Sequence, residues 1–456
     1  MAHKQFMKKK PVPQNSLKDN EPLKKMTPKK SSKKPQLLRG MKDILPQEQP
    51  YWEYVQESAQ QASRAYGYQR IEVPVLEEYQ LFARTVGESS DIVSKEMYDF
   101  ETPGGDHVAL RPEFTAGICR AFIEHGMKNI PQPVKLWTDG PLFRYDRPQA
   151  GRYRQLHQVD WEIIGSHQPA IDAELISLGS HLLGDLGLEV MARVNSIGCR
   201  ECRPAYIAVL KEYFKTHKKN LCEDCKNRLL KNPLRVLDCK EEACQAIAAE
   251  APQIVDHLCE ACREHFMKVL EYLDEGDVVY HLHPRLVRGL DYYSHTVFEF
   301  YLQKDQEEAS PAALLGGGRY DYLIQDLGGP GETPAVGMAM GIERVILAIK
   351  EAGVPVAQPP TPDVFLAQIG ETARKRALQL FEDLRQAEIA VAANISKNGL
   401  SDQLSLANKS QAKITLILGQ KEMIDNTIIA RDMENGSQET ILQTKLIDFL
   451  KKQLKK

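Results

Sequence analysis

The stretch that decides the fold is residues 134–165, which read VKLWTDGPLFRYDRPQAGRYRQLHQVDWEIIG. Two strand-like runs flank a short loop, so we expect an antiparallel pair of strands. Successive side chains of a strand point to opposite faces. One face of the second strand then carries Arg154, Leu156, Gln158, Asp160 and Glu162, and the other carries Val159, Trp161 and Ile163. The first face is expected either on a solvated sheet or on the floor of a polar pocket.

Arginines crowd around the loop of this strand pair, namely Arg144, Arg147, Arg152 and Arg154. The planar guanidinium group is suited to bidentate binding of phosphate. Two more runs carry charge in unusual places: residues 286–293 (LVRGLDYY) and residues 336–349 (VGMAMGIERVILAI). The second run predicts a long apolar helix over 336–352, and its Glu343 and Arg344 then need a partner or a ligand.

Hydrophobic periodicity predicts the other elements. We expect helices at 53–67, 115–126 and 168–187, and strands at 71–76, 278–282 and 296–302. The three glycines 316–318 predict a tight turn before a helix near 320–327. Beyond a proline cluster, strand-like and helical runs alternate, which predicts a small α/β domain with a largely parallel sheet. The chain has neither a phosphate-loop nor a dinucleotide-binding glycine signature, so nucleotide chemistry would need another fold.

Six runs resemble, in order, motifs of the class II aminoacyl-tRNA synthetases, and in particular of the histidyl-tRNA synthetase family. They are RGMKD (39–43), LRPEFTAG (110–117), FRYD (143–146) with its RPQAGRYRQLHQ loop, LVRGLDYY (286–293), LLGGGRYDYL (314–323) and AVGMAMGIER (335–344). The resemblance implies a multidomain α/β and α+β chain. We expect a class II antiparallel-sheet catalytic domain over 37–355, a helical cysteine-rich insertion at 196–275, a linker at 356–363 and an α/β anticodon-binding domain over 364–456.

The same resemblance implies a homodimeric ligase that activates L-histidine with ATP and Mg²⁺ and transfers it to the 3′ end of tRNA(His). Arg288 and Arg144 would be catalytic, because both would contact the α-phosphate. The implied histidine-binding residues are Glu113, Thr115, Arg144, Gln158, Glu162, Arg288, Tyr292 and Tyr293. The implied ATP-binding residues are Arg144, Asp146, Arg152 and Arg344, and those at the tRNA acceptor end are Arg147 and Gln149.

Two other functions are compatible with such a catalytic fold. One is a histidine-sensing regulatory paralogue of the type that serves ATP phosphoribosyltransferase. Those paralogues lack the C-terminal domain and have degraded catalytic arginines, whereas this chain has the domain and all three of Arg144, Arg288 and Arg344. The other is a non-catalytic RNA-binding protein, which the intact substrate motifs argue against.

Eight of the nine cysteines fall within residues 199–262, as the pairs Cys199/Cys202, Cys222/Cys225, Cys239/Cys244 and Cys259/Cys262. The first two pairs have the spacing of a four-thiolate zinc site, which makes them the first candidate set. The last two pairs would form a second set, although the pairing could cross between them. Reduced structural thiols and redox chemistry are the alternatives. We expect loss of Cys222 to lower tRNA aminoacylation far more than pyrophosphate exchange, on the premise that other segments build the catalytic pocket.

Charge is distributed unevenly along the chain. Residues 1–36 hold 11 Lys against Asp19 and Glu21, a net charge of +9, so the remainder carries −12 of the overall −3. This Lys-rich tail has few large apolar side chains, which predicts a disordered arm. It would serve either as a solubilising segment or for loose attraction to a polyanion such as RNA. We expect neither a membrane span nor a secretion signal, and hence a cytoplasmic protein.

Overall fold

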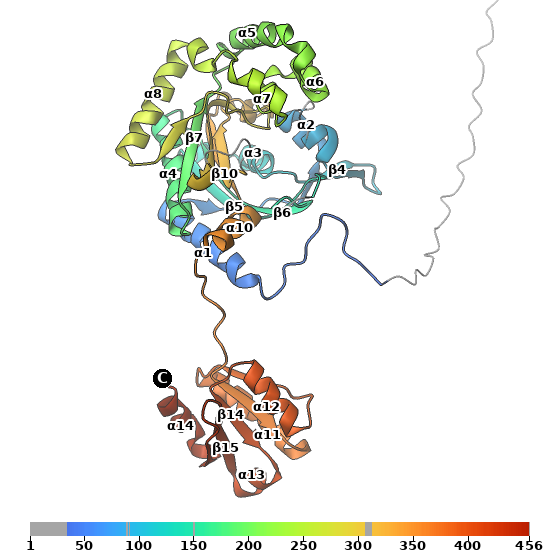
Figure 1. The fold of residues 1–456 in the computed structure, drawn as a ribbon, viewed down its shortest axis with the longest axis vertical. Helices are drawn as coiled ribbons and strands as arrows, with labels where there is room; N and C mark the ends of the chain where they lie inside the picture. Colours follow the sequence, from blue (N-terminus) through green and yellow to red (C-terminus); the bar gives the residue numbers. More distant parts are fainter. Residues whose placement is uncertain (1–33, 88–89, 91, 149–150, 306–311, 456) are drawn as a thin grey trace, which may run out of the picture.

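The computed structural model describes residues 34–87, 90, 92–148, 151–305 and 312–455. Most of the predicted tail, 1–33, therefore lies outside the described residues. Figure 1 shows a larger body that contains an extensive sheet, and a smaller body that follows it after an extended segment near residues 353–362. Within the described part of the chain, no helix combines the length and apolar character needed to cross a membrane.

An eight-stranded, mainly antiparallel sheet forms the centre of the larger body. Its strands, in spatial order, are β1 (Gln69–Arg70), β5 (Val134–Phe143), β6 (Gln155–Ile164), β11 (Ala335–Gly341), β10 (Leu315–Arg319), β9 (Ser294–Leu302), β7 (Val190–Ser196) and β8 (Tyr280–Leu282). Only the outer pairs β1–β5 and β7–β8 are parallel. The predicted antiparallel pair is confirmed, because β5 and β6 pair from Val134 opposite Ile164 to Phe143 opposite Gln155.

Three helices cover one face of this sheet and contribute to the main core: α1 (Gln49–Ala65), α4 (Pro169–Asp185) and α10 (Ile342–Ala352). The apolar face of β6 points into this core, where Trp161 is fully buried and donates its indole N–H to Ser63 Oγ at 2.8 Å. A buried ion pair between Arg319 of β10 and Asp172 of α4, 2.5 Å apart, ties helix to sheet.

A smaller three-stranded sheet lies beside the large one, in the order β2 (Leu76–Glu78), β4 (His107–Leu110), β3 (Asp99–Glu101). Around it and the adjoining core are α2 (Tyr79–Val86), a π-helix (Ile92–Glu96), α3 (Thr115–Glu124), a 3-10 helix (Met127–Asn129) and α9 (Leu323–Asp326). The predicted strand at 71–76 is wrong, because the chain here crosses from the large sheet to the small one. Pro74, which has no N–H to donate, lies in that crossing.

The insertion between β7 and β8 is helical, and in Figure 1 its helices lie together at the top of the larger body. It contains α5 (Arg203–Thr216), α6 (Glu223–Lys231), α7 (Glu242–Ala249) and α8 (Glu260–Glu275), with 3-10 helices at Lys218–Asn220, Pro233–Val236 and Ile254–His257. Helix α8 packs on α4 and contributes Phe266, Val269 and Leu273 to the main core. The remaining helices share a separate apolar cluster with the cysteines.

The smaller body is the C-terminal α/β domain. Its sheet has the order β13 (Val391–Ala393), β12 (Val364–Gln368), β14 (Ile414–Leu418), β15 (Thr427–Asp432), β16 (Gln438–Leu442). Its helices are α11 (Glu371–Gln386), α12 (Leu400–Lys409), α13 (Gln420–Asp425) and α14 (Leu446–Gln453). The sheet is mixed rather than largely parallel: β13, β12 and β14 are parallel, whereas β15 and β16 join as an antiparallel hairpin, whose turn is built on Asp432.

Two predictions near the centre of the sheet are wrong. The expected helix 336–352 is strand β11 up to Gly341 and helix only from Ile342. A short apolar run does not distinguish a buried strand from a helix, and Gly337 and Gly341 disfavour a helix. The expected turn 316–318 is part of strand β10. A β-carbon on Gly317 would lie 2.1 Å from the carbonyl oxygen of Gly337, so these glycines permit close packing of neighbouring backbones.

Candidate active site and cysteine groups

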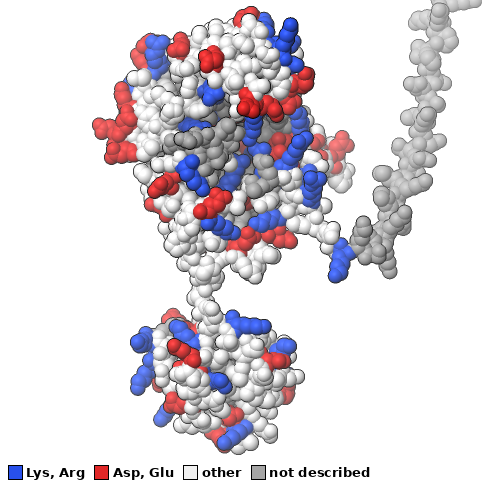
Figure 2. Space-filling view, viewed as in Figure 1, with Lys and Arg blue, Asp and Glu red and all other residues white. Residues whose placement is uncertain are grey.

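A cavity of about 740 Å³ opens over the face of the large sheet that α1, α4 and α10 leave free. Its floor comes from β6, β9, β10 and β11, and it includes Leu156, Gln158 and Asp160. The polar face of β6 is therefore the floor of a pocket and not a solvated surface. In Figure 2, Lys and Arg side chains, with some Asp and Glu side chains, lie around the centre of the larger body.

The cavity brings together most of the residues predicted from the sequence: Glu113, Thr115, Arg144, Asp146, Arg152, Gln158, Arg288, Tyr292, Tyr293 and Arg344. These residues lie in separate segments, as far apart in the sequence as Glu113 and Arg344, so the fold is what assembles them. Two predicted residues, Glu162 and Arg147, do not line it. Arg147 is exposed, next to Asp146. Gln149 lies outside the described residues.

Three arginines give one part of the cavity an excess of positive charge. Arg144 donates from Nε to the carbonyl oxygen of Pro112 at 2.8 Å, and Arg344 donates to that of Ala313 at 2.8 Å. Arg152 lies 3.1 Å from the carboxylate of Asp146. Burial lowers the pKa of Arg344, and the charges of Arg152 and Arg144 lower it further. Such convergent guanidinium groups form a binding site for an anion such as a polyphosphate.

Arg288 lies in the cavity in a charged pair with Glu299 of β9, whose second oxygen accepts from the hydroxyl of Tyr301. Burial alone would lower the pKa of Arg288, but the charge of Glu299 raises it above the ordinary value. The guanidinium group lies against β10, where a β-carbon on Gly316 would come within 2.5 Å of Nη1. Only glycine at this position leaves room for Arg288.

A second part of the site is acidic. Glu162 accepts from the hydroxyl of Thr115 at 2.6 Å and from that of Tyr320 at 2.5 Å. It is 1% exposed, and burial raises its pKa to about 8. Burial likewise raises the pKa values of Glu113 and Asp160. The structure thus sets Glu162 behind the two hydroxyl groups, out of direct contact with the cavity.

Two buried carboxylate oxygens, Glu113 Oε2 and Asp160 Oδ1, have no hydrogen-bond partner among the described residues. Both residues line the cavity. An unpaired buried acceptor is costly, so these oxygens are suited to receive N–H donors from a ligand, such as an ammonium group. The cavity therefore combines groups that fit an anion with groups that fit an amine.

Sequence reasoning did not single out Asp160, Glu299 or Tyr320 as site residues. Asp160 had a signal, because the period-two pattern places it on the same face as Gln158 and Glu162. Glu299 also had one, as the lone charge in the apolar strand run TVFEFYL. Tyr320 had one too, because it lies in the run LLGGGRYDYL (314–323), one of the six that resemble the family's motifs.

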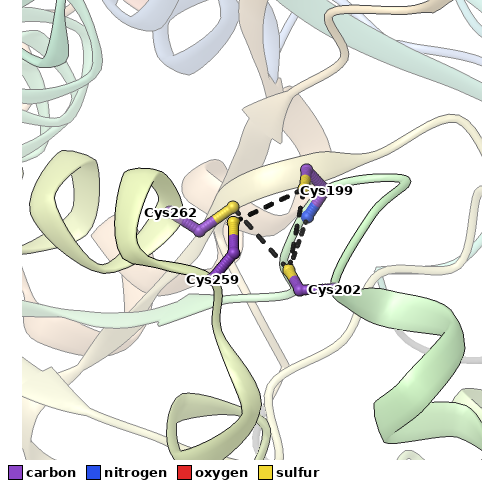
Figure 3. A group of neighbouring side chains, drawn as sticks. All are labelled: Cys199, Cys202, Cys259 and Cys262. Carbon is purple, nitrogen blue, oxygen red and sulfur yellow. Dashed lines mark hydrogen bonds between the residues drawn. The ribbon is translucent and has the colours of Figure 1, made fainter.

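The eight clustered cysteines form two groups of four, one with Cys199, Cys202, Cys259 and Cys262 (Figure 3) and the other with Cys222, Cys225, Cys239 and Cys244. The candidate set that joined Cys199 and Cys202 to Cys222 and Cys225 is therefore wrong, as is the second set. The 14 residues of α5 separate those pairs by about 20 Å of helix. The chain instead comes back to the end of β7 at the start of α8, where Cys259 and Cys262 meet the first pair.

The sulfur geometry of both groups suits a tetrahedral metal ion. Within each group the four Sγ atoms lie within 4.8 Å of one another. Neighbouring Sγ atoms are 3.7 Å apart for Cys199–Cys202, 3.8 Å for Cys199–Cys259 and 3.9 Å for Cys222–Cys239. Zinc–sulfur bonds of about 2.3 Å would set sulfurs about 3.8 Å apart in a tetrahedron, whereas a disulfide needs about 2.05 Å.

Backbone amides and helix ends add to this geometry. The amide of Cys199 donates to Cys202 Sγ at 3.3 Å, and that of Cys222 donates to Cys244 Sγ at 3.2 Å. Cys202, Cys222 and Cys259 are the N-cap residues of α5, α6 and α8. The positive end of a helix and an N–H donor both stabilise a thiolate, which is the form that binds a metal.

Comparison with known proteins agrees with this architecture. Residues 40–195 and 213–345 match the family profile described as histidyl-tRNA synthetase, and residues 363–453 match the anticodon binding domain. The histidine–tRNA ligase of Dehalococcoides mccartyi is 48% identical over 417 residues, which cover 91% of this chain and 99% of that protein. That of Pelotomaculum thermopropionicum is 44% identical, with coverages of 91% and 97%.

A solved structure gives the same result. The crystal structure of apo histidyl-tRNA synthetase from S. aureus superposes with a TM-score of 0.75 at 33% identity, and the match covers 92% of this chain and all of that one. The class II fold expected from the six sequence runs is thereby confirmed. On its motifs, its fold and its relatives, the chain belongs to the histidyl-tRNA synthetase family.

Proposed function

We propose that this protein is a histidine–tRNA ligase. It would join L-histidine and ATP to histidyl-adenylate with release of pyrophosphate, and then transfer the histidyl group to the 3′ end of tRNA(His). The observation that carries this proposal is that one cavity is lined both by Arg144, Arg288 and Arg344 and by Glu113 and Asp160, each of which has a carboxylate oxygen without a partner in the described part of the chain. A nucleoside triphosphate and an amino acid together would satisfy both sets.

In the first step the α-carboxylate of histidine attacks the α-phosphorus, and the bond to the bridging oxygen of pyrophosphate breaks. Negative charge builds up on the α-phosphate oxygens. Arg288 and Arg144 would stabilise it as preorganised cations that need no proton transfer. Arg152, Arg344 and Asp146 would hold the rest of ATP. Mg²⁺, bound mainly by the phosphates, would supply further positive charge, and the cavity offers it carboxylate oxygens of Asp146, Glu299 and Glu343.

Histidine would be bound by its amino group and its ring. Glu113, Thr115 and Gln158 would bind the α-ammonium group, and we add Asp160 because its buried oxygen lacks a partner among the described residues. Tyr292 and Tyr293 would contact the imidazole. Glu162 would act on the ring through the hydroxyl groups of Thr115 and Tyr320 that it accepts from. A site built on such polar pairs rejects an amino acid that lacks them by about 10⁴-fold or more.

The remaining partners follow from the family. The C-terminal domain matches the anticodon binding domain, which supports tRNA(His) as the partner. Arg147 and Gln149 would meet its acceptor end. We also propose that the protein is a homodimer and that it acts in the cytoplasm, where tRNA is charged. The regulatory paralogue is not favoured, because the matched ligases extend over both domains of this chain.

The cysteine groups are each proposed to hold one zinc ion. Four sulfurs at tetrahedral spacing with amide N–H donors support a closed, four-thiolate structural site. This gives two zinc ions per chain, one between β7 and α8 and one among α6, α7 and the segment that joins them.

Exchange of labelled pyrophosphate into ATP tests the proposed function, with each of the twenty amino acids supplied in turn to the full chain. Exchange is expected with L-histidine alone, because only its ring and ammonium group together match the cavity. Exchange that requires another amino acid would refute the assigned substrate, and none with any amino acid would refute the adenylation step.

A further inference from the structure

The segment that carries Arg288 has no regular secondary structure of its own. Residues 286–293, called here the signature loop, run irregularly between β8 and β9 and present Arg288, Tyr292 and Tyr293 to the cavity. An irregular segment holds a catalytic geometry only if its surroundings fix it. The contacts of this loop therefore show what positions Arg288.

The middle of the loop is held by the part of the insertion that carries the second cysteine group, which is Cys222, Cys225, Cys239 and Cys244. Arg235 donates from Nη1 to the carbonyl oxygen of Gly289 at 2.7 Å. Asn232 donates from Nδ2 to Oδ1 of Asp291 at 2.8 Å. Both donors lie on the short segment between the end of α6 and Cys239. Cys222 and Cys225 lie at the start of α6. Gly289 and Asp291, which are next to Arg288 and Tyr292, are thus hydrogen-bonded to a segment that lies between the proposed zinc ligands Cys225 and Cys239.

The end of the loop is held from the side of the first cysteine group, which is Cys199, Cys202, Cys259 and Cys262. Arg203, which directly follows Cys202, donates to the carbonyl oxygen of Tyr293 at 2.7 Å. The same guanidinium group donates to the carbonyl oxygens of Ile197 and Gly198, both at 2.9 Å. Arg203 is thereby fixed at the start of α5 beside the four sulfurs.

Packing connects the same parts. Leu286, Val287 and Tyr293 of the signature loop belong to one apolar cluster with Cys199, Cys202, Cys225, Cys239, Cys244 and Cys262. Cys222 and Cys239 even line the active-site cavity, together with Arg235 and Asp238. The premise that the catalytic pocket is built without the insertion is therefore wrong. A disturbance at the cysteines would reach the adenylation step as well as the tRNA.

We infer that the two zinc–thiolate centres hold the signature loop from two sides, through Asn232 and Arg235 on one side and Arg203 on the other, and so determine the position of Arg288. This inference rests on the proposed ligase function and on the proposed zinc ions. Asn232, Arg203 and Arg235 are positioning residues in this account. Zinc loss or loss of a positioning contact would reduce the rate of adenylate formation without any change in the substrate-contacting side chains.

The test compares three variants of the full, metal-loaded chain in histidine-dependent pyrophosphate exchange without tRNA. Cys244→Ser removes one ligand of the second centre. Asn232→Ala keeps all eight cysteines and removes the contact to Asp291. Asn220→Ala is the matched control, because Asn220 is an exposed residue of the same insertion. Zinc per chain is measured by elemental analysis, and the melting temperature shows that each variant is folded.

We expect two zinc ions per chain in the wild type, Asn232→Ala and the control, and one in Cys244→Ser. The kcat for exchange should fall in Cys244→Ser and Asn232→Ala by about tenfold to a hundredfold, the loss typical of a displacement near 1 Å. The KM for ATP should change little, because the interaction weakened is one made in the transition state. A merely structural role of Asn232 would instead lower the melting temperature and leave kcat unchanged.

Each contrary result has its own meaning. A wild type that lacks zinc would overturn the metal centres. Zinc-loaded protein whose Asn232→Ala variant exchanges within threefold of the wild type would overturn the role assigned to the loop contacts, even if Cys244→Ser had unfolded. Zinc-loaded wild type with no histidine-dependent exchange would overturn the ligase function itself.

Discussion

Replacing Gly316 by alanine tests the packing of the catalytic arginine against the sheet. The new β-carbon would lie 2.5 Å from Arg288 Nη1 and 3.0 Å from its Cζ. Ordinary contact between such atoms is about 3.5–4.0 Å, so the guanidinium group has to move by about 1 Å. The backbone of Gly316 lies in strand β10 without positive φ, and alanine is therefore not strained there.

The expected effect is a loss of activity with little loss of stability. The atom in the way is the far end of a flexible side chain, which moves at small cost to the fold. A displacement of about 1 Å at a catalytic group lowers the rate by about a hundredfold. The assay is histidine-dependent pyrophosphate exchange, measured beside the melting temperature. We expect kcat to fall by about that factor while the melting temperature changes by only a few degrees.

Gly184→Ala is the matched control, because a β-carbon at this position of α4 meets nothing within 4 Å. Alanine in a helix interior is favoured over glycine by about 1 kcal/mol, so the control should be fully active and equally or more stable. The reasoning would be refuted if Gly316→Ala stayed folded and exchanged pyrophosphate within threefold of the control.

Three further predictions concern the arginine, the buried acid and the tail. Arg288→Ala should lower histidine-dependent exchange by about 10²–10³ with the fold retained, and a loss below tenfold would contradict its role. Burial raises the pKa of Glu162 to about 8 in the folded protein, whereas its ordinary value is 4.5. Folding therefore favours the protonated carboxyl group, so the contribution of Glu162 to the free energy of unfolding is full below pH 4.5 and is lost as the pH rises to 8. The melting temperature of the wild type should therefore fall relative to that of the Glu162→Gln variant between pH 5 and pH 8. A constant difference between the two melting temperatures would refute this. Removal of residues 1–36 should leave exchange unchanged and weaken tRNA binding mainly at low salt, and equal tRNA affinity at low salt would make the tail a solubilising segment only.

The strand pair β5–β6 and the contents of its two faces could be predicted from the sequence, because a period of two is a local property. The division of residues 335–352 into strand and helix could not. Both elements are apolar, and the difference arises from the pairing of β11 between β6 and β10. Glycines 316–318 likewise suit a turn locally, and the closeness of Arg288, Gly337 and Thr296 explains them in a strand.

The candidate site was predictable to the extent that its residues belong to recognisable runs, and the structure collects most of those residues in one cavity. Glu299 was missed because its importance depends on Arg288, a contact between separate segments. The grouping of the cysteines failed for a similar reason. Pairs that are adjacent in the sequence are separated by α5, and the return of the chain to the end of β7 before α8 begins decides which pairs meet.

The most direct test of the central claim is the charging of tRNA. The purified full chain is incubated with ATP, Mg²⁺, labelled L-histidine and a mixture of transfer RNAs, and the label attached to RNA is identified by tRNA species. The account predicts that histidine is esterified to the 3′ end of tRNA(His) and to no other tRNA. Histidine-dependent pyrophosphate exchange without any label on tRNA(His) would contradict it, because the protein would then form the adenylate without being a tRNA ligase.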